Sequence, residues 1–293
     1  MGKNRLFEKP FSLSIGPQRA ASTWIDRYLR WRRDVCLPSE VKEIFFFDRH
    51  YQKGPQFYKS HFNPEPRHKL IMEVSATYFD CAEAPGRVYE TLGPEIKMIC
   101  PLRDPVKRSY SLYKHYLRYG IVNGDLKQAV EQKPQIIESS RYADHLDRWF
   151  YYFDRQNIKI LLQEILENDP DRFVNQLCDG LDIPTITPDD TLLKRVNPTT
   201  QNRNAMLASI AQNSADWLRE RRIYWPVNMA RRVGLKSLIF GREDVSAKSS
   251  PKSSPKSSDK TKDMPEEDHK YLHSLLSGEV KKLENLLGHS LEI

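Results

Sequence analysis

One segment constrains the fold more than any other, because an apolar run leads straight into a helical pattern through an Arg-Asp-Pro turn. Residues 95–99 are predicted to form a short strand, and Asp104-Pro105 ends the strand region and opens a helix, since Pro is tolerated in a first helical turn. Arg103 then stands at the strand end and Ser111 two turns into the helix. A guanidinium offers a rigid fork of donors, so the segment is typical of a phosphate clamp. The alternative is an ordinary junction with Arg103 in a surface salt bridge.

A second segment repeats this arrangement near the start of the chain. Residues 11–16 alternate as a strand, and a turn with Arg19 leads into Ser22-Thr23 and an amphipathic helix. Backbone N–H groups at a helix N-terminus point outward and favour an anion. The alternative is a common strand–helix turn with Ser22 as N-cap. The GxxxxGK[ST] pattern is absent, which disfavours a standard nucleoside triphosphate loop.

The alternation of strands and helices predicts an α/β protein with a P-loop-like central parallel β-sheet flanked by helices. We expect strands at 11–16, 69–73, 96–101 and 158–162, and helices at 22–32, 84–92, 105–119, 140–153 and 170–181. A single domain would span 1–293, and residues 205–222 would add a helix. The Lys-Ser-Ser-Pro repeats at 246–262 predict a disordered linker. Leucines at helical spacing predict one helix over 265–288 that docks on the domain.

The net charge and the cysteines indicate which ligands and which cellular location to expect. The formal net charge is +7 and the pI about 9.1, which favours anionic ligands. No nucleic-acid motif is recognisable, so we expect no nucleic-acid partner. The four cysteines match no zinc or CxxC spacing. Reduced thiols, together with the lack of a predicted signal peptide or membrane anchor, predict a cytoplasmic protein.

These motifs resemble a known family. Residues 15–25 resemble the 5′-phosphosulfate loop of sulfotransferases that use 3′-phosphoadenosine-5′-phosphosulfate, and residues 102–113 resemble their 3′-phosphate motif. The stretches 42–48 and 73–79 are similar to segments of the heparan sulfate N-deacetylase/N-sulfotransferases and 3-O-sulfotransferases. Residues 142–149 and 158–164 resemble the next helix and strand, so the likeness covers roughly 10–185. It implies the sulfotransferase fold and a soluble bacterial-style member, or the catalytic part of a longer protein.

The resemblance also implies roles for individual residues. Glu73 would be the base that takes the acceptor proton, and Arg19 falls where the family has its catalytic Lys. His115 resembles an acceptor-side His of the N-sulfotransferase branch. The product would be 3′-phosphoadenosine-5′-phosphate, and no metal is needed. The donor nucleotide would be held by Arg19, Ala20, Ala21, Ser22, Thr23, Trp24, Arg103 and Ser111.

The sequence departs from the family at several of these positions. Arg19 cannot readily give up a proton as Lys can, Ala20 and Ala21 replace glycines, and Val74 replaces a second Lys. If the loop needs a positive φ, Ala strains it. The alternative is therefore a catalytically weak or inactive nucleotide-binding protein; a small-molecule kinase would need a P-loop Lys that is missing.

The acceptor is predicted less sharply than the donor. A hydroxyl or amine of a saccharide or glycolipid is expected from the resemblance, with a small molecule as the broader class. Aromatic faces and Arg forks suit sugars. The side chains that would line a sugar cleft are Tyr51, Phe57, Tyr58, His61, Tyr116, Arg118 and Tyr119.

Overall fold

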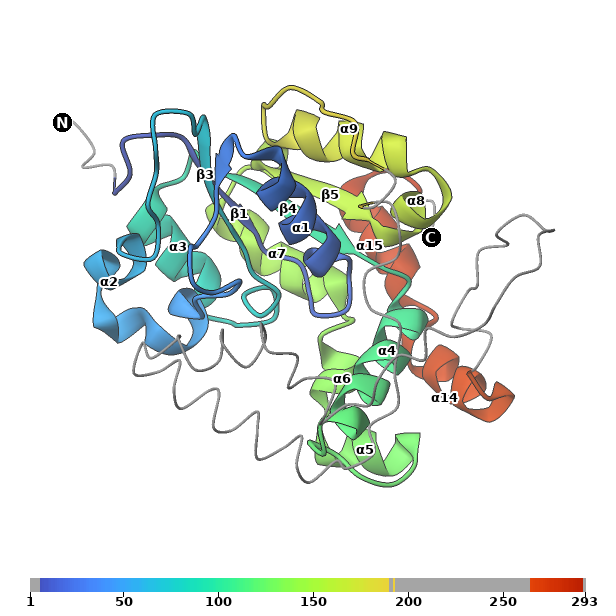
Figure 1. Ribbon diagram of the computed structural model, residues 1–293. Helices are drawn as coiled ribbons and strands as arrows, with labels where there is room; N and C mark the ends of the chain where they lie inside the picture. Colours follow the sequence, from blue (N-terminus) through green and yellow to red (C-terminus); the bar gives the residue numbers. More distant parts are fainter. Residues whose placement is uncertain (1–5, 190–191, 193–263, 292–293) are drawn as a thin grey trace, which may run out of the picture.

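The computed structural model describes residues 6–189, 192 and 264–291, and its centre is a parallel sheet (Figure 1). The five strands pair in the order β2-β3-β1-β4-β5. Their bounds are β1 Phe11–Ser14, β2 Val35–Cys36, β3 Leu70–Val74, β4 Lys97–Leu102 and β5 Ile158–Leu162. The predicted α/β class and parallel sheet are confirmed. The edge strand β2 was not predicted, because two residues are too few to show a periodic pattern.

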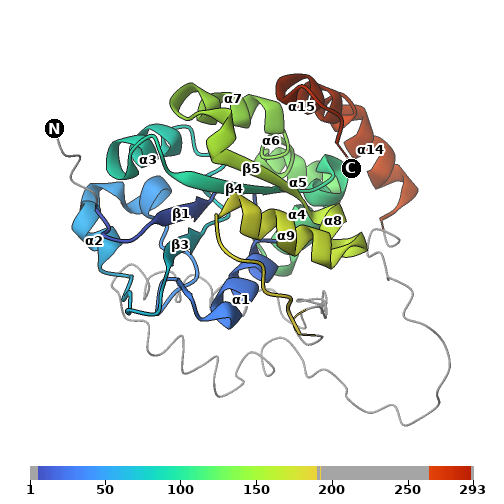
Figure 2. The same cartoon turned by 90° about the horizontal axis from the view of Figure 1, so that it is seen from above.

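Helices cover both faces of the sheet, as Figure 2 shows. On one face lie α1 (Ser22–Arg32) and α9 (Pro170–Gly180), and on the other lie α3 (Ala84–Leu92) and α7 (Tyr142–Tyr152). A parallel sheet covered on both sides has buried strands, and every residue of β3 is buried. Shorter helices that the sequence did not predict are α2 (Pro55–Lys59), α5 (Leu126–Gln132), α6 (Gln135–Glu138) and α8 (Gln163–Asn168), together with the helical turns η1 (Phe46–His50), η2 (Tyr51–Lys53) and η3 (Arg155–Asn157).

Two Asp-Pro pairs start helices as predicted. Asp104 caps α4 (Pro105–Arg118), and its Oδ1 accepts a hydrogen bond of 2.7 Å from the Lys107 amide. Asp169 caps α9 through the Arg172 amide at 3.0 Å. In both helices Pro occupies the first turn, where its missing N–H costs no hydrogen bond. The clamp segment is therefore a strand, a capped turn and a helix.

The C-terminal segment forms two helices, so the prediction of one helix over 265–288 is wrong. The chain breaks at Ser277-Gly278 between α14 (Glu266–Leu276) and α15 (Glu279–Leu287). Helix α14 packs on α4 and α6, whereas α15 packs on α7. One straight helix could not reach both places, and Gly weakens a helix where it bends. The predicted helix at 205–222 and linker at 246–262 lie outside the described residues.

The chain order places a ligand site at one end of the sheet. After β1 the chain forms β2 and β3 on one side, and then β4 and β5 on the other. Ligands of such sheets bind outside the carboxyl ends of the strands at this switch point, here between β1 and β4. The two strand exits approach closely, since a Cβ on Gly16 would lie 2.4 Å from the Pro101 carbonyl oxygen.

Two further features concern membrane-spanning helices and the cysteines. No helix in the described part of the chain is both long and apolar enough to cross a membrane. All four cysteines are free thiols, and three of them are buried. The cytoplasmic location stays a prediction.

Candidate active site

The loop after β1 adopts a backbone that suits glycine but contains none at its bends. Arg19 has a φ of 72° and Ala21 a φ of 60°. Ala21 precedes α1 directly, and its carbonyl accepts hydrogen bonds from the amides of Trp24 and Ile25 at 2.9 and 3.1 Å. A left-handed backbone costs an L-residue roughly 1–2 kcal/mol. The predicted strain is confirmed at Ala21, whereas Ala20 is buried without a positive φ.

At the start of α1 lies a cation that the sequence analysis missed. Ser22 does not act as the N-cap; its Oγ accepts a hydrogen bond of 3.1 Å from Lys42 Nζ. Lys42 also forms an ion pair of 2.8 Å with Glu43. The signal was present in the Lys-Glu pair of the 42–48 stretch. Nearby, Thr23 is half-buried, and the indole N–H of buried Trp24 donates to the Leu192 carbonyl at 3.0 Å.

Two guanidinium groups lie close together at the switch point, that of buried Arg103 and that of half-buried Arg19. Arg103 follows β4, is 6% exposed, and its Nε is buried without a hydrogen-bond partner. Arg19 Nε donates to Ser111 Oγ on α4 at 3.0 Å. Within the described residues neither arginine forms an ion pair; the nearby Glu164 instead accepts from the Asp104 amide at 3.0 Å. Burial, and then the charge of Arg103, lower the pKa of Arg19. An anion would relieve this repulsion.

His115 lies one helical turn beyond Ser111, as predicted, and is half-buried. Its ring packs against Tyr119 with the centroids 4.7 Å apart. Burial, followed by the positive charges of Arg19 and Arg118, lowers the pKa of His115 to about 4. The imidazole is therefore neutral near pH 7. Its role on the acceptor side stays a prediction.

Glu73 lies in β3 but is sealed inside the protein. Its side chain is 0% exposed. Its Oε1 accepts from the Ile44 amide at 2.8 Å, its Oε2 accepts from the Tyr58 hydroxyl at 2.8 Å, and Tyr78 donates to both oxygens. Burial raises the pKa of Glu73 to about 8. This geometry argues against Glu73 as the base, since an acceptor hydroxyl cannot reach it. Val74, which stands where the resemblance expects a second Lys, is uncharged and 0% exposed.

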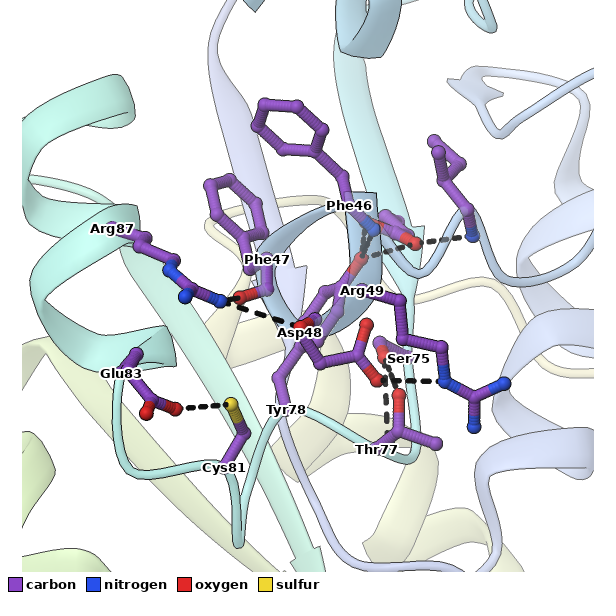
Figure 3. A network of polar contacts seen from close by, with 12 residues as sticks. Phe46, Phe47, Asp48, Arg49, Ser75, Thr77, Tyr78, Cys81, Glu83 and Arg87 are labelled. Atoms are coloured by element: carbon purple, nitrogen blue, oxygen red, sulfur yellow. Dashed lines mark hydrogen bonds and ion pairs between the residues drawn. The ribbon is translucent and has the colours of Figure 1, made fainter. Parts of the chain in front are cut away.

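Tyr78, which donates to Glu73, and Arg87 also hold the 46–48 segment in place; Figure 3 shows the contacts of Tyr78 and Arg87 with this segment. The Phe46 amide donates to the Tyr78 hydroxyl at 2.9 Å, and Arg87 donates to the Phe47 carbonyl at 2.8 Å. Asp48 follows, with its Oδ2 3.6 Å from Arg49 Nε and a hydrogen bond to Thr77. Asp48 Oδ1 is buried without a partner, and burial raises the pKa of this carboxyl.

A pocket of about 360 Å³ opens beside the loop that follows β1. Of the predicted sugar-cleft residues, only Tyr116 is among the described residues that line it. Tyr58 and His61 are 0% and 6% exposed, so their prediction as cleft residues is wrong; both are packed into the domain. The lining consists of Gln18, Asp48, Arg49, Thr77, Asp80, Cys81, Leu112, Tyr116, Gln135 and Ser139.

Comparison with known proteins agrees with this fold. The bifunctional heparan sulfate N-deacetylase/N-sulfotransferase 1 of Caenorhabditis briggsae is 30% identical in an alignment of 198 positions that covers 60% of this chain and 23% of that protein. The human heparan sulfate glucosamine 3-O-sulfotransferase 6 is 28% identical in an alignment of 195 positions that covers 61% of this chain and 54% of the relative. The chain thus spans about half or less of the length of these relatives.

A solved structure and a family profile cover more of the chain. The sulfotransferase from Alicyclobacillus acidocaldarius aligns with a TM-score of 0.56 and 21% identity, over 74% of this chain and 96% of that one. This likeness shows the fold. The profile of the sulfotransferase domain matches residues 11–214, more than half of the chain. The chain therefore belongs to the sulfotransferase domain family.

Proposed function

We propose that this sulfotransferase uses 3′-phosphoadenosine-5′-phosphosulfate and transfers its sulfonate to a hydroxyl or amine of a saccharide or glycolipid. One observation carries the proposal: buried Arg103 and half-buried Arg19 lie close together at the carboxyl ends of β4 and β1, and neither forms an ion pair within the described residues. The donor carries two separate anionic groups, a 5′-phosphosulfate and a 3′-phosphate. Two cations on two loops suit such a ligand.

The donor contacts divide between the two loops. Arg103 and Ser111 would hold the 3′-phosphate, and the unpartnered Nε of Arg103 would gain an acceptor there. The 16–23 loop would hold the 5′-phosphate through backbone N–H groups at the start of α1. Arg19 and Lys42 would stabilise the negative charge that grows on the leaving phosphate. The reaction needs no metal and no redox group.

We assign the base to Glu43 rather than Glu73. The Glu43 side chain is 18% exposed and lies beside Lys42, whose ammonium contacts Ser22 at the start of α1. Glu73 acts as a positioning residue, because it fixes the Ile44 amide directly after Glu43. In the reaction the acceptor oxygen or nitrogen attacks sulfur, the sulfur bond to the 5′-phosphate oxygen breaks, and Glu43 takes the acceptor proton. The other product is 3′-phosphoadenosine-5′-phosphate.

Thermal unfolding tests the donor site. A ligand at about 100 times its dissociation constant stabilises a protein by roughly 2.7 kcal/mol. We expect 3′-phosphoadenosine-5′-phosphate to raise the melting temperature, and ATP with Mg²⁺ to have little effect. The absence of any shift with the 3′-phosphorylated nucleotide would contradict the donor assignment.

Transfer of labelled sulfonate to a panel of glycosides and amines then tests the chemistry. We expect Glu43→Gln to abolish transfer while the nucleotide still binds, and Glu73→Gln to retain transfer whenever the protein is folded. The opposite pattern would restore Glu73 as the base. Nucleotide binding without transfer by the unmodified protein to any acceptor would favour the catalytically inactive alternative.

A further inference from the structure

We infer that the pocket beside Gln18 binds an uncharged, hydroxyl-rich acceptor, such as a neutral sugar ring, and rejects acceptors that bring a carboxylate. This inference rests on the proposed function and names the class of acceptor. Its starting point is the place of the pocket. Gln18 belongs to the loop after β1, and Leu112 follows Ser111 on α4. The pocket therefore adjoins both loops that would hold the donor.

The charges around the pocket disfavour an anion. Two carboxylates, Asp48 and Asp80, line it, with one cation, Arg49. Arg49 already lies 3.6 Å from Asp48, and its guanidinium sits 4.4 Å from the centre of the Phe45 ring. With two carboxylates and one guanidinium, the lining carries a formal net charge of −1. A carboxylate brought into the pocket would meet a net like charge, and like-charge juxtaposition lowers affinity.

A second cation lies behind the pocket wall but offers no donor to a ligand. Arg108 is fully buried, and the charge of Asp80 acts on it. Its guanidinium hydrogens are used by Ser140, by the Ile136 carbonyl and by other neighbours on α4 and α6. The positive charge of Arg108 therefore partly offsets the negative charge of Asp80, but Arg108 cannot bind a carboxylate in the pocket.

The remaining lining suits hydroxyl groups. The Asp48 side chain lines the pocket and is 11% exposed, so a sugar hydroxyl could donate to the exposed part of its carboxylate. Thr77, Gln18 and Gln135 each carry groups that donate and groups that accept, as sugar hydroxyls do. Leu112 and Tyr116 supply an apolar wall for the C–H face of a ring. At about 360 Å³ the pocket lies at the small end of ligand sites.

This acceptor class differs in charge from the heparan sulfate that names the relatives. At position 74, where the resemblance expects a second Lys, the chain has a Val that is 0% exposed. A cation is thus missing from the segment that leads to Thr77 and Asp80, and both of those residues line the pocket. The loss of a cation and the presence of two carboxylates both disfavour an anionic acceptor.

A matched pair of probes tests the inference. Phenyl β-glucoside and phenyl β-glucuronide differ only at the exocyclic carbon, which is a CH₂OH group in one and a carboxylate in the other. We would measure the binding of each to the full chain, with and without 3′-phosphoadenosine-5′-phosphate, by saturation-transfer NMR. We expect the glucoside to bind about tenfold more tightly than the glucuronide, as like-charge repulsion requires.

Variants that remove the charge of Asp48 or Asp80 test whether these carboxylates cause the difference in affinity between the two probes. Asp48→Asn and Asp80→Asn should each bring the two affinities closer, whereas Asp171→Asn, an exposed change on α9, should leave their ratio unchanged. Equal binding of the two probes, tighter binding of the glucuronide, binding of neither probe, or a ratio that the pocket variants do not change would each overturn the inference. Thermal shift with the nucleotide, recorded on every variant, reports the fold and the donor site separately. A failed donor site is thereby distinguished from a wrong acceptor class.

Discussion

The stability of this protein should depend on pH through Glu73. In the folded state burial raises the pKa of this carboxyl from its ordinary 4.5 to about 8. Between these values the folded chain keeps a proton that the unfolded chain releases, so stability falls as pH rises. Each unit of pH in this window removes about 1.4 kcal/mol. Between about pH 5 and pH 8 the loss from Glu73 is on the order of 4 kcal/mol.

The variant Glu73→Gln isolates this contribution, because glutamine does not titrate. Its Oε1 can still accept from the Ile44 amide, and the Tyr58 hydroxyl can turn to accept from its NH₂ group. Urea unfolding followed by tryptophan fluorescence gives the free energy of unfolding at each pH. The difference between the unmodified protein and the variant should shrink, or change sign, as pH rises. Other carboxyls with raised pKa values, such as Asp48 and Glu164, are present in both proteins and cancel.

The control is Glu43→Gln, which changes a carboxylate that is partly exposed and paired with Lys42. Its stability should still fall as pH rises, because Glu73 stays buried; the negative charge of Glu43 is only the last of the causes that raise the pKa of Glu73. If Glu73→Gln and the unmodified protein gave parallel curves from pH 5 to 8, Glu73 would not hold a proton in the folded state. The positioning role assigned to it would then lose its physical basis.

Three further predictions concern the donor site. Arg103→Ala should weaken binding of the 3′-phosphorylated nucleotide by about 10- to 100-fold, since a charged hydrogen bond contributes about 1.5–3 kcal/mol; calorimetry with the 3′-hydroxyl nucleotide is the comparison, and equal weakening of both would remove the clamp assignment. Lys42→Met should lower the rate constant for transfer more than it weakens binding of 3′-phosphoadenosine-5′-phosphate, and an unchanged rate would exclude Lys42 from the reaction. Ala21→Gly should stabilise the fold by about 0.5–1 kcal/mol, because relief of the left-handed strain exceeds the added entropy of the unfolded chain; a lower melting temperature would contradict this.

Much of the proposed donor site could be predicted because its signals are local. Asp104-Pro105 ends β4 and opens α4 through contacts within three residues. Resemblance then placed Arg19, Arg103 and Ser111 together, and the structure brings them into one cluster. The strain at Ala21 also followed, since backbone handedness depends on one residue.

The sequence could not show which of the two carboxylates, Glu43 or Glu73, is accessible to a substrate. Glu43 and Glu73 stand in similar sequence surroundings, yet one is partly exposed beside Lys42 and the other is sealed. What seals Glu73 is a pair of hydroxyls, from Tyr58 and Tyr78, that reach it from two other segments. Burial, not residue type, sets the pKa and the access of a carboxyl.

The sequence by itself therefore determined the α/β class, the two strand–turn–helix loops and the membership of the sulfotransferase domain family, because strand–turn–helix units and helix caps arise from neighbouring residues. The tertiary structure alone decided which carboxylate lies beside the loop that follows β1, that Lys42 contacts Ser22, and that Asp48 and Asp80 line one pocket. These features join residues far apart in the chain, so they exist only once the core has packed.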